Sequence, residues 1–280
     1  MTQSRPKFSF KEVLTKLPRG EPLGTGALRE YGVSEFRASD LARSGWLTHL
    51  GRGVYMLPGD TLSRDGCLAF LSRRTPGFHV GGKTALDWRG IRQNVSFREV
   101  LTLWGDEPKR LPAWFTERFS SRYQATQLFD GQLPKGTGLQ SLPTGRPDVL
   151  VSVPERALLE LLSDVGKTQP LEEARQLVEL LHTLREKVLD QLLAHTTRIK
   201  VVRLAELLGR ELALPWAATA ARHSQRIGGG KRWVAVTKSG ERLDLRRPRT
   251  SNTSTPCAYC WPLPRRCSAH RASHSRAARL

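Results

Sequence analysis

Residues 34–58, SEFRASDLARSGWLTHLGRGVYMLP, are the stretch from which the predicted fold follows. Ser34 can accept a hydrogen bond from the free backbone amides at the start of a helix over residues 35–44. Gly45 suits the left-handed residue that commonly follows a helix. Apolar runs on both sides of Gly51-Arg52-Gly53 indicate two strands joined in a β-hairpin. A short helix followed at once by a tight hairpin is typical of a winged helix-turn-helix.

Two further helices are expected before this stretch. Apolar residues recur at helical spacing over residues 9–17 and predict the first helix. Thr25 is expected to cap a second helix over residues 26–31. In the helix that follows, Phe36 and Leu41 are expected to face inward. Residues 1–60 are therefore predicted to form a winged helix of three helices and a two-stranded hairpin.

The outer face of the third helix is the candidate DNA-binding surface. In a winged helix this helix enters the major groove, and side chains near its N-terminus reach the base edges. Arg37 and Ser39 are the main candidates for that contact, and Arg43 shares their face. Arg52 at the hairpin tip would meet phosphate or the minor groove. The alternatives are a solvated charged face or a winged helix that binds protein.

Charge and composition favour a polyanionic partner. The 280 residues carry a formal net charge of +19 at pH 7 and a pI near 10.7, which most often accompanies nucleic-acid binding. Residues 246–280 hold eight arginines and no acidic residue, so a surplus of +11 remains in residues 1–245. No long apolar run and no secretory signal is present at the N-terminus, which predicts a cytoplasmic protein without a membrane partner.

Residues 61–245 are predicted to form a mixed α/β domain with a helical C-terminal half, so the whole chain is expected to be α+β. Strands are expected over residues 98–103, 122–128 and 148–153. Ser152 to Glu155 resembles a capping box that opens a helix, with Pro154 at its second position. Further helices are expected from residue 170 to residue 214, where leucine stripes predict the core of a small bundle, with a dimer seam as the alternative.

Residues 77–84, GFHVGGKT, match the phosphate-binding pattern G-x-x-x-x-G-K-[ST]. A phosphate loop needs a strand before its first glycine and bare amides within it. Here Thr75-Pro76 precedes Gly77, and Phe78-His79-Val80 indicate a strand inside the supposed loop. The favoured interpretation is a short strand, a Gly-Gly turn and a helix over residues 84–88. A nucleotide-binding enzyme is the weakest function considered, and no catalytic residue or cofactor is predicted.

The cysteines divide between the body and the tail. Cys67 lies in an apolar context and is expected to be a small core residue. The basic tail over residues 246–280 lacks hydrophobic periodicity and is predicted to be disordered; its composition is also typical of a GC-rich gene translated out of frame. A weaker alternative is a zinc site with C-x2-C-x6-C-x2-H spacing, formed by Cys257, Cys260, Cys267 and His270.

Three phrases carry a family resemblance: GWLTHLGRGVYMLPGD at 45–60, FHVGGKTALDWRGI at 78–91 and VSVPERALLELL at 151–162. Together they resemble the AbiEi antitoxins of type IV toxin–antitoxin systems, over roughly residues 8–245. The resemblance implies an N-terminal winged helix, a C-terminal antitoxin domain and no catalytic residues. It also implies repression of the protein's own operon and neutralisation of a nucleotidyltransferase-like toxin. The DNA contacts that it implies are Ser34, Arg37, Ser39 and Arg52.

The leading hypothesis is thus a DNA-binding autorepressor that acts as an antitoxin. Its expected partners are operator DNA upstream of its own operon and a cognate toxin, and a homodimer remains open. The alternative is a winged-helix transcription factor whose second domain dimerises or binds a ligand and has no toxin partner.

Overall fold

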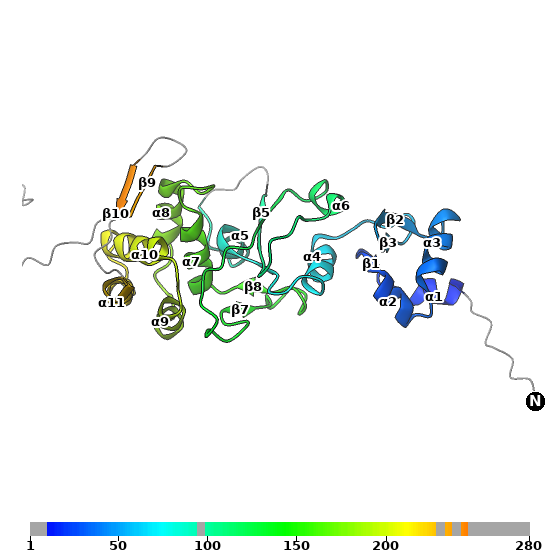
Figure 1. The fold of residues 1–280 in the computed structure, drawn as a ribbon, viewed down its shortest axis with the longest axis horizontal. Coiled ribbons are helices and arrows are strands. Elements are labelled where there is room, and N and C mark those ends of the chain that lie inside the picture. The colour runs from blue at the N-terminus through cyan, green and yellow to red at the C-terminus, as the bar shows by residue number, and fades with distance from the viewer. Residues whose placement is uncertain (1–9, 94–98, 228–232, 237–241, 246–280) are drawn as a thin grey trace, which may run out of the picture. The chain divides into compact units, whose positions relative to one another are not determined.

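The computed structural model describes residues 10–93, 99–227, 233–236 and 242–245 (Figure 1). Over these residues helices and short strands are mixed throughout the chain, which confirms the α+β prediction. Among them, no helix is long and apolar enough to cross a membrane.

The N-terminal region is a winged helix. Its elements in chain order are α1 (Phe10–Lys16), β1 (Leu23–Gly24), α2 (Thr25–Glu30), α3 (Glu35–Arg43), β2 (Thr48–Gly51) and β3 (Val54–Met56). The strands form an antiparallel sheet in the order β1-β3-β2. The β2–β3 hairpin was predicted. Strand β1 was not, because two residues are too few to show an alternating pattern.

Two predictions about these helices are wrong. Thr25 does not cap α2, because it is the first helical residue and Gly24 occupies the cap position without a side-chain bond. Phe36 does not face inward but is 74% exposed. Ala38 and Leu41 define the buried side of α3. Since successive helical residues rotate by about 100°, a residue two positions before Ala38 points to the opposite side.

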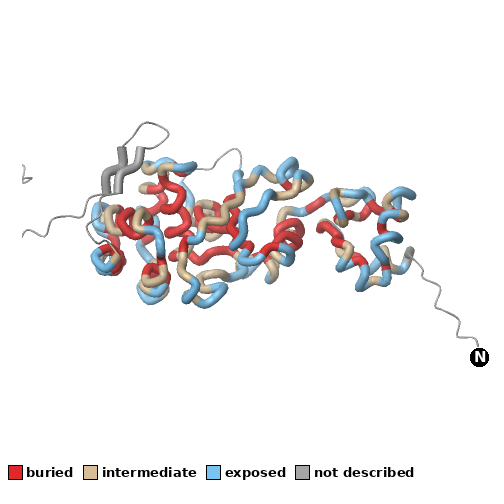
Figure 2. The backbone as a smooth tube through the Cα atoms, viewed as in Figure 1, coloured by how far each residue is buried: buried red, intermediate tan, exposed pale blue. Residues whose placement is uncertain are grey.

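A separate hydrophobic cluster holds the winged helix together. Its buried members are Leu17, Leu23, Leu28, Val33, Ala38, Leu41, Leu47, Tyr55 and Leu57. Figure 2 marks in red the buried residues along the backbone. Helices α2 and α3 and strand β3 contribute buried members, and partly buried Val13 and Leu14 of α1 pack against them, so the outer face of α3 is presented on a packed support.

A five-stranded mixed sheet forms the first half of the body, in the order β6-β5-β4-β8-β7. Pairs β4–β8 and β5–β6 are parallel, whereas β4–β5 and β7–β8 are antiparallel. The elements are α4 (Arg64–Ser72), β4 (His79–Val80), α5 (Gly82–Trp88), β5 (Leu101–Trp104), α6 (Ala113–Thr116), β6 (Ser121–Gln124), β7 (Leu139–Gln140) and β8 (Val151–Ser152). Over the described residues the three predicted strands are present but shorter than expected, and β7 was not predicted.

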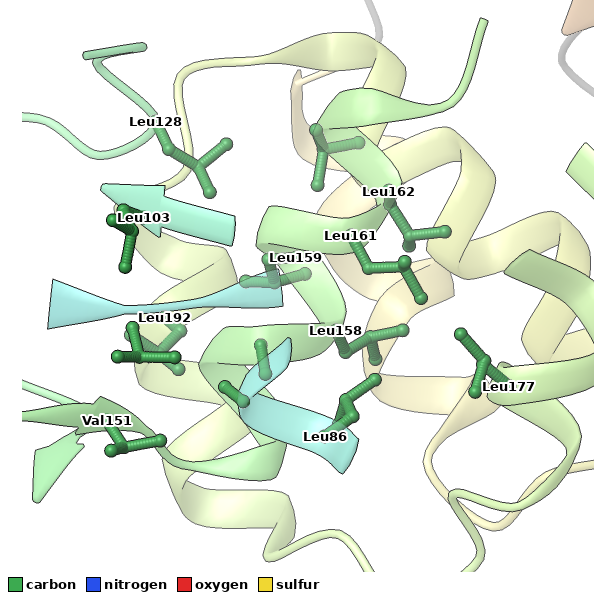
Figure 3. Packing of buried hydrophobic residues seen from close by; sticks show 14 of the residues in the cluster. Leu86, Leu103, Leu128, Val151, Leu158, Leu159, Leu161, Leu162, Leu177 and Leu192 are labelled. Atoms are coloured by element: carbon green, nitrogen blue, oxygen red, sulfur yellow. The ribbon is translucent and has the colours of Figure 1, made fainter. Parts of the chain in front are cut away.

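The second half is helical, as predicted. It contains α7 (Pro154–Asp164), α8 (Leu171–Glu179), α9 (Glu186–Ala194), α10 (Ile199–Glu211) and α11 (Ala217–Ile227), followed by the antiparallel hairpin β9 (Trp233–Val236) and β10 (Arg242–Leu245). Helix α7 lies at the centre of the main core, where Leu158, Leu159 and Leu162 are fully buried (Figure 3). The leucines of α8 to α10 are mostly core residues, but Leu180 is 42% exposed.

The predicted capping box at the start of α7 is wrong. Val153 is the cap residue and makes no side-chain bond, and Pro154 is the first helical residue. The Ser152 hydroxyl instead donates to Glu160 at 2.8 Å. The Glu155 carboxylate accepts hydrogen bonds from Arg185, the nearer at 2.8 Å. Ser152 and Glu155 therefore bond to Glu160 and Arg185 and do not cap the helix.

Candidate nucleic-acid interface

Helix α3 begins at a side-chain cap, as predicted. The Ser34 hydroxyl accepts a hydrogen bond from the backbone N–H of Arg37 at 3.2 Å. Gly45, which follows the helix, has a φ of 77°, a conformation that side chains disfavour. A serine hydroxyl that accepts one bond can still donate its proton. Ser34 can therefore cap the helix and donate to a phosphate oxygen at the same time.

The exposed side of α3 carries the predicted contact residues. Arg37, Ser39 and Arg43 are all exposed, whereas Ala38 and Leu41 are buried. The Ser39 hydroxyl donates to the Glu35 carbonyl at 3.1 Å and lies 3.3 Å from the Tyr55 hydroxyl on β3. Ser39 therefore links the helix to the sheet and holds the angle between them.

Arginines compensate the acidic residues of α3. Glu35 pairs with Arg29 of α2 at 3.4 Å, and Asp40 pairs with Arg43 at 2.7 Å. Exposed ion pairs of this kind contribute only about 0–1 kcal/mol, so phosphate can compete for either arginine. The Arg37 guanidinium has no ion pair or hydrogen bond with any residue that the structure describes. Arg37 is thus the side chain on α3 whose charge is available without a rearrangement.

The wing presents a second available cation. Arg52 is exposed at the tip of the β2–β3 hairpin, and Gly53 beside it has a φ of 67°. The pairing register shifts between His49 and Gly51, where the hairpin is irregular. The Arg52 guanidinium also has no ion pair within the described part of the chain. The Gly53 carbonyl accepts a hydrogen bond from the Thr25 amide at 3.1 Å, which ties the turn of the hairpin to the start of α2.

Phe36 lies on the surface, contrary to the expectation that it faces inward. It follows Glu35 at the start of α3, directly before Arg37, and no other large apolar side chain among the described residues is as exposed. The signal that could have revealed this was available in the sequence. A buried stripe built on Ala38 and Leu41 requires Phe36 to point outward.

Residues 77–84 do not form an open phosphate loop. His79 and Val80 form strand β4 inside the pattern, and α5 begins at Gly82 rather than at Thr84. The Gly82 N–H donates to the Glu160 carboxylate at 2.9 Å, and a side chain at Gly81 would overlap Glu160 and Trp104. Lys83 pairs with Glu173 of α8. The Gly82 amide and the Lys83 ammonium, which would bind a phosphate in this pattern, are therefore engaged with carboxylates of the chain, and the Thr84 hydroxyl is bonded to the backbone of β5 and the residue before it.

Glu160 is the centre of that arrangement. It is fully buried, and besides Gly82 it accepts hydrogen bonds from His79 at 2.9 Å, Ser152 at 2.8 Å and Arg156 at 2.8 Å. Burial alone raises the pKa of this carboxyl, but the charges and hydrogen bonds of His79 and Arg156 outweigh it and lower the pKa to about 2. Glu160 is therefore ionised throughout the physiological range and joins β4, β8, α5 and α7.

A cleft of about 650 Å³ lies between α5, β5, α7 and α8. Several of its charged side chains pair with one another across its walls, among them Lys83 with Glu173 and Arg64 with Glu99. Asp164 is buried at its edge, and burial raises the pKa of this carboxyl while Gln124 opposes the shift. Most of the charged side chains that line this cleft are engaged in ion pairs.

The described residues contain no group of three or more His, Cys, Asp or Glu side chains arranged for a metal ion. Cys257, Cys260, Cys267 and His270 lie outside the described residues, as does the predicted disordered tail. Cys67 is buried in the core as predicted, and burial raises the pKa of its thiol to about 12.

Two family models match the chain. Residues 7–97 match the one described as transcriptional regulator, AbiEi antitoxin N-terminal domain. Residues 98–246 match the one described as transcriptional regulator, AbiEi antitoxin, Type IV TA system. No curated protein matches the sequence.

A solved structure of similar fold is the crystal structure of the RV2827C protein from Mycobacterium tuberculosis. The two chains are 17% identical with a TM-score of 0.50, over 84% of this chain and 90% of that one. At this level of identity the likeness concerns the fold alone.

Proposed function

The chain belongs to the AbiEi antitoxin family of transcriptional regulators from type IV toxin–antitoxin systems, and we propose that it represses its own operon and neutralises a nucleotidyltransferase-like toxin. Membership makes the protein a DNA-binding antitoxin regulator, in a family described by regulation rather than catalysis. The proposal adds the operator, the kind of toxin and the residues that contact DNA. Both activities belong to the cytoplasm, where operator DNA is found.

The DNA-binding part of this proposal is supported by two exposed arginines, one on α3 and one on the wing, that have no ion pair with any described residue. Arg37 lies in the first turn of α3, where side chains of a recognition helix reach the major groove. A guanidinium there can donate two hydrogen bonds to a guanine edge. Arg52 at the wing tip is suited to phosphate or to a narrow minor groove. Ser34 and Arg43 are assigned to the adjacent phosphates. Ser39, whose proton goes to the Glu35 carbonyl, is assigned with Arg37 to the base edges, where its oxygen can accept from a base amino group.

The toxin half rests on family membership and on the division of the chain into two hydrophobic clusters. The cluster of the winged helix ends at Leu57, and the larger cluster extends from Val54 through α11. We assign DNA binding to residues 1–60 and toxin neutralisation to residues 61–245. On this assignment, substitutions on the outer face of α3 remove repression without removing neutralisation.

The DNA half is tested by measuring binding of the full-length protein to the intergenic DNA upstream of its gene. We expect Arg37→Ala and Arg52→Ala each to weaken binding by about 1–3 kcal/mol. Since Arg37 is assigned to a base, its loss should relax discrimination between operator variants. Because Arg52 is assigned to phosphate, its loss should reduce the salt dependence by about one unit of slope.

Arg210→Ala is the matched control. Arg210 is exposed in the last turn of α10 and its loss changes the net charge by the same amount. If both α3 and wing variants bind like the wild type, or if Arg210→Ala weakens binding equally, the contact assignment is wrong.

The toxin half is tested in cells that produce the nucleotidyltransferase-like protein encoded beside this gene. Co-production of the full chain should restore growth, and the Arg37→Ala variant should restore it equally well. Failure of the wild type to restore growth contradicts the toxin assignment and leaves the DNA assignment standing. Rescue by the wild type but not by Arg37→Ala contradicts the division of labour between the two parts.

A further inference from the structure

The Phe36 side chain is not part of the hydrophobic cluster that holds the winged helix together. It is 74% exposed, whereas the other exposed large apolar side chains of the described residues, Trp46, Val100 and Leu180, are 42–44% exposed. The buried side of α3 is complete without it, since Ala38 and Leu41 supply the contacts to the cluster beneath. A single exposed apolar residue is common in proteins, so its meaning depends on where it lies.

The position of Phe36 is informative because of its neighbours. It is the second residue of a nine-residue helix whose start is capped by Ser34. Arg37 follows it directly, with a guanidinium that makes no ion pair to other described residues. Glu35 before it is held by Arg29. An apolar ring is thus set in the first turn of the helix, beside a free positive charge and a compensated negative one.

We propose that Phe36 determines part of the operator sequence by packing its ring against the 5-methyl group of a thymine in the major groove. This inference rests on the DNA-binding function proposed above. The thymine methyl is the apolar group that B-DNA presents in its major groove, and phenylalanine is among the side chains that contact it. The first turn of a recognition helix is the part that comes close enough to base edges for such contact.

The charge around Phe36 distinguishes DNA from an apolar protein partner. A protein-binding patch would be expected to extend into further exposed apolar side chains, whereas the exposed residues next to Phe36 on α3 are Glu35, Arg37 and Ser39. The surface of DNA consists mostly of phosphates and polar base edges. A single aromatic ring among polar and cationic side chains matches such a surface where the ring meets a thymine methyl group.

The test combines a protein substitution with a substitution in the DNA. The site bound by the full-length protein is first defined by footprinting, and each thymine in it is then replaced singly by deoxyuridine, which lacks only the methyl group. Burying one methyl contributes about 0.8 kcal/mol, which is about a fourfold change in the dissociation constant. We expect about a fourfold loss for the wild type at one or more uracil positions.

Phe36→Ala should bind the thymine operator more weakly than the wild type by at least the same factor of about four, and show no further loss on the same uracil DNA. Phe36→Leu should keep part of the response, because leucine still offers an apolar contact. Leu180→Ala removes another exposed apolar side chain, from the body, and should respond to uracil like the wild type.

Tight binding by the wild type that is insensitive to uracil at every thymine of the footprint overturns this inference and leaves the DNA-binding function intact. Normal DNA binding by Phe36→Ala, with loss of toxin neutralisation or of self-association, also overturns it, because the ring then serves a protein contact. Absence of any binding by the wild type to the upstream DNA overturns the proposed repressor function itself.

Discussion

Replacing Glu160 by glutamine should destabilise the body by about 3–5 kcal/mol at pH 7, the range found when one partner of a buried ion pair is removed. The carboxylate is fully buried and accepts bonds from His79, Gly82, Ser152 and Arg156. Glutamine keeps the shape, but its NH₂ group faces two of these donors and cannot accept from them. Arg156, whose side chain is only 14% exposed, also loses its counter-ion.

The pKa of Glu160 gives a second measure of the same interaction. A fall from 4.5 to about 2 corresponds to roughly 3 kcal/mol, at about 1.36 kcal/mol per unit. Because the folded pKa lies below the unfolded one, this stabilisation is fully present above pH 4.5 and is lost as the pH falls toward 2. The part of the stability difference between the wild type and Glu160→Gln that this pKa contributes should therefore shrink as the pH falls below 4.5.

The measurement is urea unfolding of both full-length proteins at pH 7, 5 and 3.5, followed by circular dichroism and by tryptophan fluorescence. Coincidence of the two signals checks that a single transition is being compared. Glu172→Gln is the control, since this carboxylate is 73% exposed and 3.7 Å from Arg175, and its loss should cost less than about 1 kcal/mol. An unchanged midpoint for Glu160→Gln at pH 7, or a difference that does not shrink at pH 3.5, would refute the reasoning.

Two further predictions concern the packing and the caps. Ser34→Ala should cost about 1 kcal/mol through loss of the bond to the Arg37 amide, and Ser34→Asp should retain most of the stability, since both residues cap well. Thermal unfolding measures both, and an alanine variant as stable as the aspartate variant contradicts the cap. Leu158→Ala should cost about 2–5 kcal/mol because Leu158 is fully buried, whereas half-exposed Leu180→Ala should cost much less. Equal losses in urea unfolding would contradict the assignment of α7 to the core.

The parts of the fold that local chemistry specifies could be predicted from the sequence. Ser34, Gly45 and the Gly-Arg-Gly turn act within a few residues of themselves, and the structure has the predicted cap, helix end and hairpin at those positions. Strand β1 could not be predicted in this way. Its two residues become a strand only by pairing with β3, which lies about thirty residues further along the chain.

The prediction of a capping box at the start of α7 is also wrong because of contacts with residues further along the chain. Ser152 and Glu155 have the spacing of a capping box, but Ser152 donates to Glu160 and Glu155 binds Arg185 thirty residues away. A charge-assisted bond between partly buried groups is stronger than a bond between neutral groups at a helix end. The hydrogen bonds to Glu160 and Arg185 are therefore formed in place of the capping-box bonds. Phe36 differs, because its exposure follows from the helical spacing of Ala38 and Leu41 and could have been read from the sequence.

The pattern at residues 77–84 shows why a sequence match to a phosphate loop is insufficient evidence for phosphate binding. The pattern specifies glycines and a lysine, but not what their backbone and side chains contact. Here an ionised carboxylate, Glu160, accepts the Gly82 amide, and Glu173 pairs with Lys83. A phosphate would have to displace two anions that the fold supplies, at the cost of leaving His79 and Arg156 without their partner. We propose that DNA instead meets Arg37 and Arg52, two exposed arginines that have no ion pair with any described residue.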